Sequence, residues 1–310
     1  MGLIKKIQSN EKLMRFIESI QKHITETEIG GRSVVVAYYL LLSFFPLLIV
    51  IGNLLPYLDI TPETVLPYVR EIIPMEIYNF LKPAIENLLS NNSGGLLSIS
   101  VLAALWSASK GVNALQTALN RAYGVEDRGN FVISRIVSVG MVAVLLVAII
   151  GVALFFSIGQ VVMDALQPLL GFSTEYIDIF TTLRWPVTVV GLLLILSALY
   201  MVIPNARVPF KYTLPGTATT TIGWMVLTQG FGLYARTFAR SISGYQIIGS
   251  FIVLMLWLNF AATLVIFGGI INVTLQEFQT GREVKEGRNR FQKILRFFKR
   301  KAFKKKSEKD

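Results

Sequence analysis

The chain has 310 residues, of which 53% are hydrophobic and 16% are charged, with a formal net charge of +11. Soluble domains contain about 25% charged residues, so this composition indicates a membrane protein. Cysteine is absent, which excludes disulfides, thiolate metal sites and a cysteine nucleophile. The single histidine, His23, lies in a polar stretch, where a solvated or interfacial role is commoner than catalysis.

Residues 1–33 are polar and rich in Lys and Arg. Within them, apolar residues recur at helical spacing at Leu13, Ile17, Ile20 and Ile24. We expect a cytoplasmic amphipathic segment that precedes the membrane domain.

Six long apolar stretches then fill most of the chain up to residue 273. Crossing about 30 Å of hydrocarbon takes about 20 apolar residues in a helix, which satisfies its own backbone groups in lipid. We therefore predict an all-α polytopic membrane protein, whose membrane domain covers residues 34–275. The six transmembrane helices are expected at about residues 34–55, 95–115, 136–161, 183–203, 214–234 and 247–273.

Two prolines fall inside predicted spans, Pro46 in the first and Pro186 in the fourth. Proline removes a helical hydrogen bond and bends the helix, so both residues are candidate hinges. A harmless bend is the alternative.

The segment 56–94 between the first two spans is too long for a simple turn. Its prolines and its apolar residues at helical spacing, such as Ile77, Leu81 and Ile85, predict short external amphipathic helices. They form either a packed cap on the bundle or a lid over a cavity.

Polar side chains interrupt the second span. Lys110, Asn113, Gln116 and Asn120 recur at spacings of three or four, with Arg121 beside them. Such residues in a span usually face a cavity or a partner. They form either a wall of a hydrophilic pathway or lipid-headgroup site, or they bond neighbouring helices while Lys110 snorkels to the interface.

The loop after the fourth span contributes Asn205 and Arg207 to the same candidate substrate-binding set. Arg and Lys side chains at a cytoplasmic opening bind phosphate through charge-assisted hydrogen bonds. The expected substrate is a lipid or another anionic molecule.

The tail, residues 276–310, is strongly basic, with 13 basic and 4 acidic residues from residue 282 onwards. Its apolar residues Phe291, Ile294, Leu295 and Phe298 follow helical spacing. This pattern predicts a membrane-surface helix on the anionic cytoplasmic leaflet and disfavours a nucleic-acid partner.

Lys and Arg are concentrated in both termini and in every second loop. By the positive-inside rule, both termini are cytoplasmic and the protein is a multi-pass protein of the cytoplasmic membrane.

The motifs of ATPases, zinc hydrolases and nucleophile-elbow hydrolases are missing. We therefore expect no enzyme activity, no metal and no cofactor.

Several fragments resemble the YihY/BrkB family of polytopic inner-membrane proteins, formerly labelled ribonuclease BN. They are Ala37-Tyr38-Tyr39, Leu42-Ser43-Phe44-Phe45-Pro46-Leu47, Trp106-Ser107-Ala108-Ser109, Ala118-Leu119-Asn120-Arg121-Ala122-Tyr123, Pro204-Asn205, Leu214-Pro215-Gly216 and Leu256-Trp257-Leu258. The resemblance implies an envelope protein, with relatives linked to lipid or lipopolysaccharide export and virulence. Ile270 stands where the family often has an acid, so a role for that carboxylate is not carried over.

These observations favour a transporter or lipid translocase with a polar site facing the cytoplasm. A non-catalytic scaffold that recruits envelope enzymes is the alternative, and ribonuclease activity is disfavoured.

Overall fold

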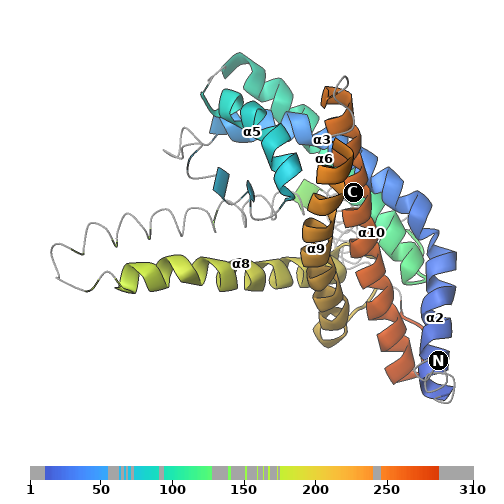
Figure 1. Cartoon of the computed structure of the whole chain (residues 1–310). Helices are drawn as coiled ribbons and strands as arrows, with labels where there is room; N and C mark the ends of the chain where they lie inside the picture. Colours follow the sequence, from blue (N-terminus) through green and yellow to red (C-terminus); the bar gives the residue numbers. More distant parts are fainter. Residues whose placement is uncertain are drawn as a thin grey trace, which may run out of the picture.

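The computed structural model of the chain describes residues 11–54, 73–90, 94–127, 175–239 and 246–285, with some single positions within 63–70 and 139–173. The described residues are nearly all helical, which confirms the predicted all-α class. The helices are α2 (Glu11–Thr27), α3 (Ile29–Leu54), α5 (Met75–Ser90), α6 (Gly94–Ala122), α8 (Glu175–Val202), α9 (Phe210–Ala239) and α10 (Gln246–Thr280) (Figure 1).

Five of these helices match the predicted first, second, fourth, fifth and sixth apolar stretches, and each extends beyond its stretch by several residues at one end or both. Helices α3 and α8 end one residue before the predicted end. Most of the third stretch, residues 136–161, lies outside the described residues, as do the predicted surface residues Phe291, Ile294, Leu295 and Phe298.

By length and composition, one described helical stretch, Phe251–Thr280, is able to cross a membrane. The apolar stretches Ile29–Phe44 and Val189–Val202 are shorter. The count of six spans therefore stays a prediction. Pro46 and Pro186 lie inside α3 and α8, and their role as hinges also stays a prediction.

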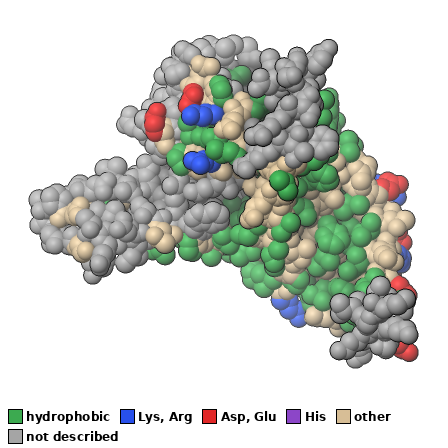
Figure 2. Space-filling view, in the orientation of Figure 1, with side chains coloured by type: hydrophobic (Ala, Val, Ile, Leu, Met, Phe, Trp, Pro, Cys, Tyr) green, Lys and Arg blue, Asp and Glu red, His purple; other side chains and the backbone are tan. Residues whose placement is uncertain are grey.

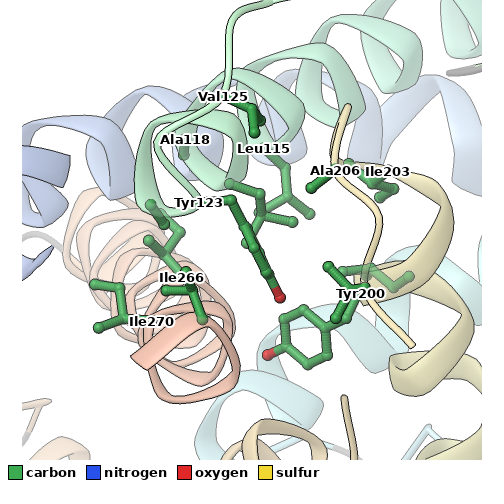
Figure 3. Packing of buried hydrophobic residues seen from close by; sticks show 14 of the residues in the cluster. Leu115, Ala118, Tyr123, Val125, Tyr200, Ile203, Ala206, Ile266 and Ile270 are labelled. Atoms are coloured by element: carbon green, nitrogen blue, oxygen red, sulfur yellow. The ribbon is translucent and has the colours of Figure 1, made fainter. Parts of the chain in front are cut away.

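Two clusters of buried side chains hold the helices together. The first core lies where the C-terminal ends of α6, α8 and α10 meet. Its members include Leu119, Ala122, Tyr123, Leu199, Tyr200, Ile203, Ile266, Ile270 and Val273. Figure 3 shows Tyr123 and Tyr200 in this cluster, with Ile266 and Ile270 on α10. Ile20 and Ile24 of α2 pack against this core, so the N-terminal apolar stripe faces the bundle.

Helices α9 and α10 cross closely at two glycines of the first core region. A Cβ atom on Gly268 would collide with Thr220 Oγ1 and the Tyr200 hydroxyl, and one on Gly216 would collide with the Gly268 carbonyl. The Gly216 N–H donates to Asn272 Oδ1 at 2.7 Å, which ties the two helices together at this crossing. Small residues permit such close backbone approach.

The second core lies at the opposite end of the bundle and includes Leu41, Ile77, Tyr78, Leu81, Ile85, Phe231, Leu254 and Trp257. Three of these residues, Ile77, Leu81 and Ile85, come from one face of α5 at spacings of four. Helix α5 therefore packs as a cap on α3, α9 and α10.

The surface of the bundle is rich in exposed apolar side chains. Figure 2 shows one largely hydrophobic face with charged side chains at its margins. Leu194, Val226 and Leu233, on α8 and α9, are 58%, 66% and 71% exposed. Such a surface suits a hydrocarbon environment, because large exposed apolar patches are rare on soluble monomers.

Helix α2 is joined to α10 by an aromatic and an ionic contact. Phe16 and Phe278 meet edge to face at 5.6 Å between ring centroids. His23 is half-buried, with Nδ1 2.8 Å from the Ser19 carbonyl and Nε2 3.4 Å from Glu277 Oε2. Glu277 raises the pKa of His23, because the carboxylate stabilises the imidazolium more than burial disfavours it.

Candidate functional site

Two adjoining cavities lie along the side of α6 that faces α2 and α3. The tip cavity, about 600 Å³, is lined by Glu26, Arg32, Thr117, Asn120, Arg121, Gly124, Val125, Glu126 and Asp127. The mid-helix cavity, about 430 Å³, is lined by Glu28, Gly31, Arg32, Val35, Tyr39, Lys110, Asn113, Ala114 and Thr117. Arg32 and Thr117 line both cavities, and we call the two cavities together the groove.

The groove follows one face of α6. At about 100° per residue, Lys110, Asn113, Thr117 and Asn120 fall within about 80° of one another. Gln116 lies about 40° outside this arc and lines neither cavity. Most residues of the predicted polar face therefore line the groove, whereas Gln116 faces the segment that contains Ile203.

Lys110 connects the mid-helix cavity to the apolar surface. Its ammonium lies 5.5 Å from the centre of the Trp106 ring, and Trp106 is 55% exposed. Val35, on the opposite wall, is 48% exposed. The cavity therefore lies next to side chains that would meet lipid tails.

Arg32 stands at the junction of the two cavities. Its Nε donates to the Thr27 carbonyl at 2.8 Å, and its Nη2 lies 3.4 Å from Glu28 Oε2. These contacts hold the guanidinium across the break between α2 and α3, where Glu28 has a φ of 52°. Arg32 was not among the predicted site residues, although a basic residue at the start of an apolar helix is typical of a membrane interface.

Asp127 is exposed and lines the tip cavity, and it was not among the predicted site residues either. After α6 the chain reverses at Gly124, whose φ of 62° suits glycine at a helix C-terminus. Asp127 then lies against α6, where its carboxylate accepts from Asn120 Nδ2 at 2.7 Å and from Thr117 Oγ1 at 3.5 Å. No sequence motif predicts that this loop packs back against α6.

A buried bridge of hydrogen bonds connects α6 to the loop that joins α8 to α9. Its side chains are Asn120, Gln116 and Asn205. The Asn205 N–H donates to Asn120 Oδ1 at 2.6 Å, and Asn205 Nδ2 donates to the Glu126 carbonyl at 3.1 Å. Gln116 Nε2 donates to the Ile203 carbonyl at 2.9 Å. The bridge fixes the wall of the tip cavity, and Asn120 belongs to both.

The other candidates lie at different distances from the groove. Arg121 is exposed and lines the tip cavity. Arg207 is exposed, lines neither cavity, and donates its backbone N–H to the Lys285 carbonyl at 3.0 Å. Among the described residues, no three or more His, Asp or Glu side chains gather as metal ligands would.

Sequence similarity to known proteins assigns this chain to a family. The sequence pattern of the family described as Virulence factor BrkB matches residues 20–293. The ribonuclease-like protein YfkH of Bacillus subtilis (strain 168) is 35% identical over 268 residues, which cover 85% of this chain and 96% of that protein. A UPF0761 membrane protein of Psychrobacter sp. (strain PRwf-1) is 26% identical over 251 residues, 78% of this chain and 45% of that protein.

No solved structure matches the chain. The family match covers most of the sequence, and the Bacillus relative is similar over nearly its whole length. The chain is therefore a membrane protein that belongs to the Virulence factor BrkB family.

Proposed function

We propose that this protein is a transporter of the cytoplasmic membrane that binds phosphate-bearing lipid headgroups in the groove and moves them between leaflets. The observation that carries the proposal is Arg32 at the junction of two cavities, one of which also contains Lys110 beside an exposed apolar surface.

The chemistry of the groove supports a phosphate ligand. A guanidinium offers fixed pairs of N–H donors that match phosphate oxygens, and an ammonium adds a mobile point charge. Backbone and side-chain contacts already orient Arg32, so binding orders fewer of its bonds.

The apolar surroundings support lateral entry of the lipid. Trp106 and Val35 adjoin the mid-helix cavity and are about half exposed. A headgroup that enters between α3 and α6 leaves its acyl chains in hydrocarbon, where their transfer costs no apolar exposure to water.

We further propose that the chain crosses the membrane six times with both termini in the cytoplasm. The basic tail then lies on the anionic leaflet. Because the natural chain has no cysteine, single cysteines report topology without background labelling. An impermeant maleimide applied outside intact cells should label Asn79→Cys, at an exposed position of α5, and spare Thr25→Cys. The reverse pattern would invert the topology.

Transport is tested by reconstitution. Vesicles with a fluorescent phospholipid are treated with an impermeant quencher, and the accessible fraction is followed over time. Loss of a hydrogen bond to a charged group costs about 1.5–3 kcal/mol, so Arg32→Gln and Lys110→Ala should slow flipping by about tenfold or more. Arg121→Ala should have a smaller effect, because the side chain is exposed.

Lys211→Ala is the matched control. Lys211 also lies over an aromatic ring, 4.6 Å from the centre of Tyr212, but lines neither cavity. Wild-type protein that flips no lipid would end the transport proposal. Normal flipping by Arg32→Gln and Lys110→Ala would remove the groove from the mechanism. Tolerated groove substitutions together with a stoichiometric protein partner would favour the scaffold.

A further inference from the structure

The groove contains acidic as well as basic groups, which a site for a simple anion does not need. Its lining has four acidic side chains, Glu26, Glu28, Glu126 and Asp127, against three basic ones. A ligand with phosphate as its only charge would meet a formal charge of −1 in the empty groove. A ligand that also carries a positive charge fits this lining better.

The acidic groups are not equivalent. Glu28 lies 3.4 Å from the Arg32 guanidinium, and Glu26 lies 3.9 Å from Lys22 Nζ. Asp127 receives its hydrogen bonds from two neutral groups, the Asn120 amide and the Thr117 hydroxyl. These two donors are neutral, so their hydrogen bonds orient the carboxylate without cancelling its charge, and no described residue forms an ion pair with it.

Asp127 also keeps the capacity to bind a further donor. An ionised carboxylate has about four lone-pair sites, and two are used here. Arg32 and Asp127 both line the tip cavity, whose volume is about 600 Å³. One headgroup can therefore touch both.

We propose that the ligand is an amine–phosphate headgroup of the phosphoethanolamine type, an inference that rests on the proposed function. The Arg32 guanidinium binds the phosphate, and the Asp127 carboxylate binds the primary ammonium. A primary ammonium has three N–H donors for the carboxylate, whereas a trimethylammonium has none. The site should prefer ethanolamine over choline and over the uncharged glycerol headgroup.

The preference is measured by calorimetry on the purified full chain in detergent. The probes are phosphatidylethanolamine, phosphatidylglycerol and phosphatidylcholine with identical short acyl chains. An exposed ion pair supports about a fivefold preference, so the ethanolamine lipid should bind about fivefold tighter than the other two. Asp127→Asn should abolish this preference and leave phosphatidylglycerol binding equal or stronger. Arg32→Gln should weaken all three.

Two further variants test whether a lost headgroup preference results from misfolding. Asp127→Glu keeps the charge and should keep part of the preference. Glu283→Gln removes an exposed acid outside both cavities and should change nothing. Phosphatidylglycerol binding by Asp127→Asn shows that this variant is folded.

The outcomes separate this inference from the proposed function. Equal binding of the three lipids by the wild type, or an unchanged preference in Asp127→Asn, overturns amine recognition and leaves headgroup binding intact. Failure to bind any of the lipids overturns both. Glycerophosphoethanolamine that binds as tightly as the lipid supports amine–phosphate recognition but identifies a soluble ligand, which overturns lipid translocation.

Discussion

The two ends of the helical bundle are held together by different chemistry. Around the first core, polar side chains link one helix to another: the Tyr200 hydroxyl donates to the Val265 carbonyl at 2.8 Å and lies 2.7 Å from Thr220 Oγ1. Around the second core, aliphatic and aromatic side chains pack together, as in the edge-to-face pair of Trp224 and Trp257 at 5.3 Å.

The difference shows what each kind of contact specifies. Apolar packing is non-directional, so it holds α5 against the bundle without fixing each group to one partner. Buried hydrogen bonds have defined partners and geometry, and they fix how far one helix lies along another. The groove lies at the hydrogen-bonded end, where side-chain positions are fixed most closely.

The largest expected effect is a loss of packing at the apolar end. Ile77 is 2% exposed in the second core, and large-to-small core substitutions cost about 2–5 kcal/mol. Ile77→Ala should lower the melting temperature in detergent strongly and leave headgroup affinity of the folded protein unchanged. Asn79→Ala, exposed on the same helix, is the control. If Ile77→Ala lowered headgroup affinity at a temperature where the protein is folded, the two ends of the bundle would be coupled.

The glycine crossing at the other end should tolerate little added volume. Gly268→Ala places a methyl group against Thr220, Tyr200 and the Gly216 backbone, and overpacking costs about 1–3 kcal/mol. We expect a lower melting temperature together with slower lipid flipping. Gly230→Ala adds the same methyl group to α9 in open space and should be neutral or slightly stabilising. Equal melting temperatures for the two variants would contradict the close crossing.

The hydrogen-bonded bridge predicts a coupled loss of stability and binding. Asn120→Ala leaves the Asn205 N–H without its acceptor and removes the shorter of two hydrogen bonds to the Asp127 carboxylate, at a cost of about 1–2 kcal/mol. Both the melting temperature and the affinity for the ethanolamine lipid should fall. Arg121→Ala, next in sequence but exposed, should leave the melting temperature within about 1 °C. An unaltered ethanolamine preference in Asn120→Ala would show that Asp127 needs no such support.

The smallest effect concerns pH. Glu277, with help from Glu26 and the Ser19 carbonyl, raises the pKa of His23, so the protonated ring favours the folded state. This stabilisation is complete below the ordinary histidine pKa of about 6.5 and is lost as pH rises through the raised pKa of the folded protein. The melting temperature should therefore fall slightly between pH 6 and pH 8.5. His23→Gln should remove that difference, and the same fall in both proteins would refute the assignment.

The sequence predicted the helices well because apolar runs and helical spacing depend only on residues near one another in the chain. Long apolar runs identified five helices that the structure describes, and helical spacing identified the buried face of α5 at Ile77, Leu81 and Ile85. The same reasoning selected the polar face of α6, since residues three or four apart share a side of any helix. It also selected the N-terminal stripe, of which Ile20 and Ile24 pack against the first core.

Sequence reasoning did not separate the polar residues of α6 by the groups they face. Gln116 and Asn205 resemble Asn113 in chemistry, yet the first two belong to the bridge and Asn113 lines a cavity. Which side of a helix meets a loop some 80 residues away depends on helix rotation and packing. The spacing of residues within α6 does not predict how the helix is rotated relative to its neighbours.

Composition and apolar periodicity by themselves determined that the chain is helical, belongs in a membrane and has a polar face on α6, because these properties depend on neighbouring residues. Only the tertiary structure decided that Arg32 and Asp127 join that face to form a groove. Arg32 lies in the first turn of α3, just after the break at Glu28, and Asp127 follows a chain reversal at Gly124. Their meeting results from the packing of three helices, and no single segment specifies it.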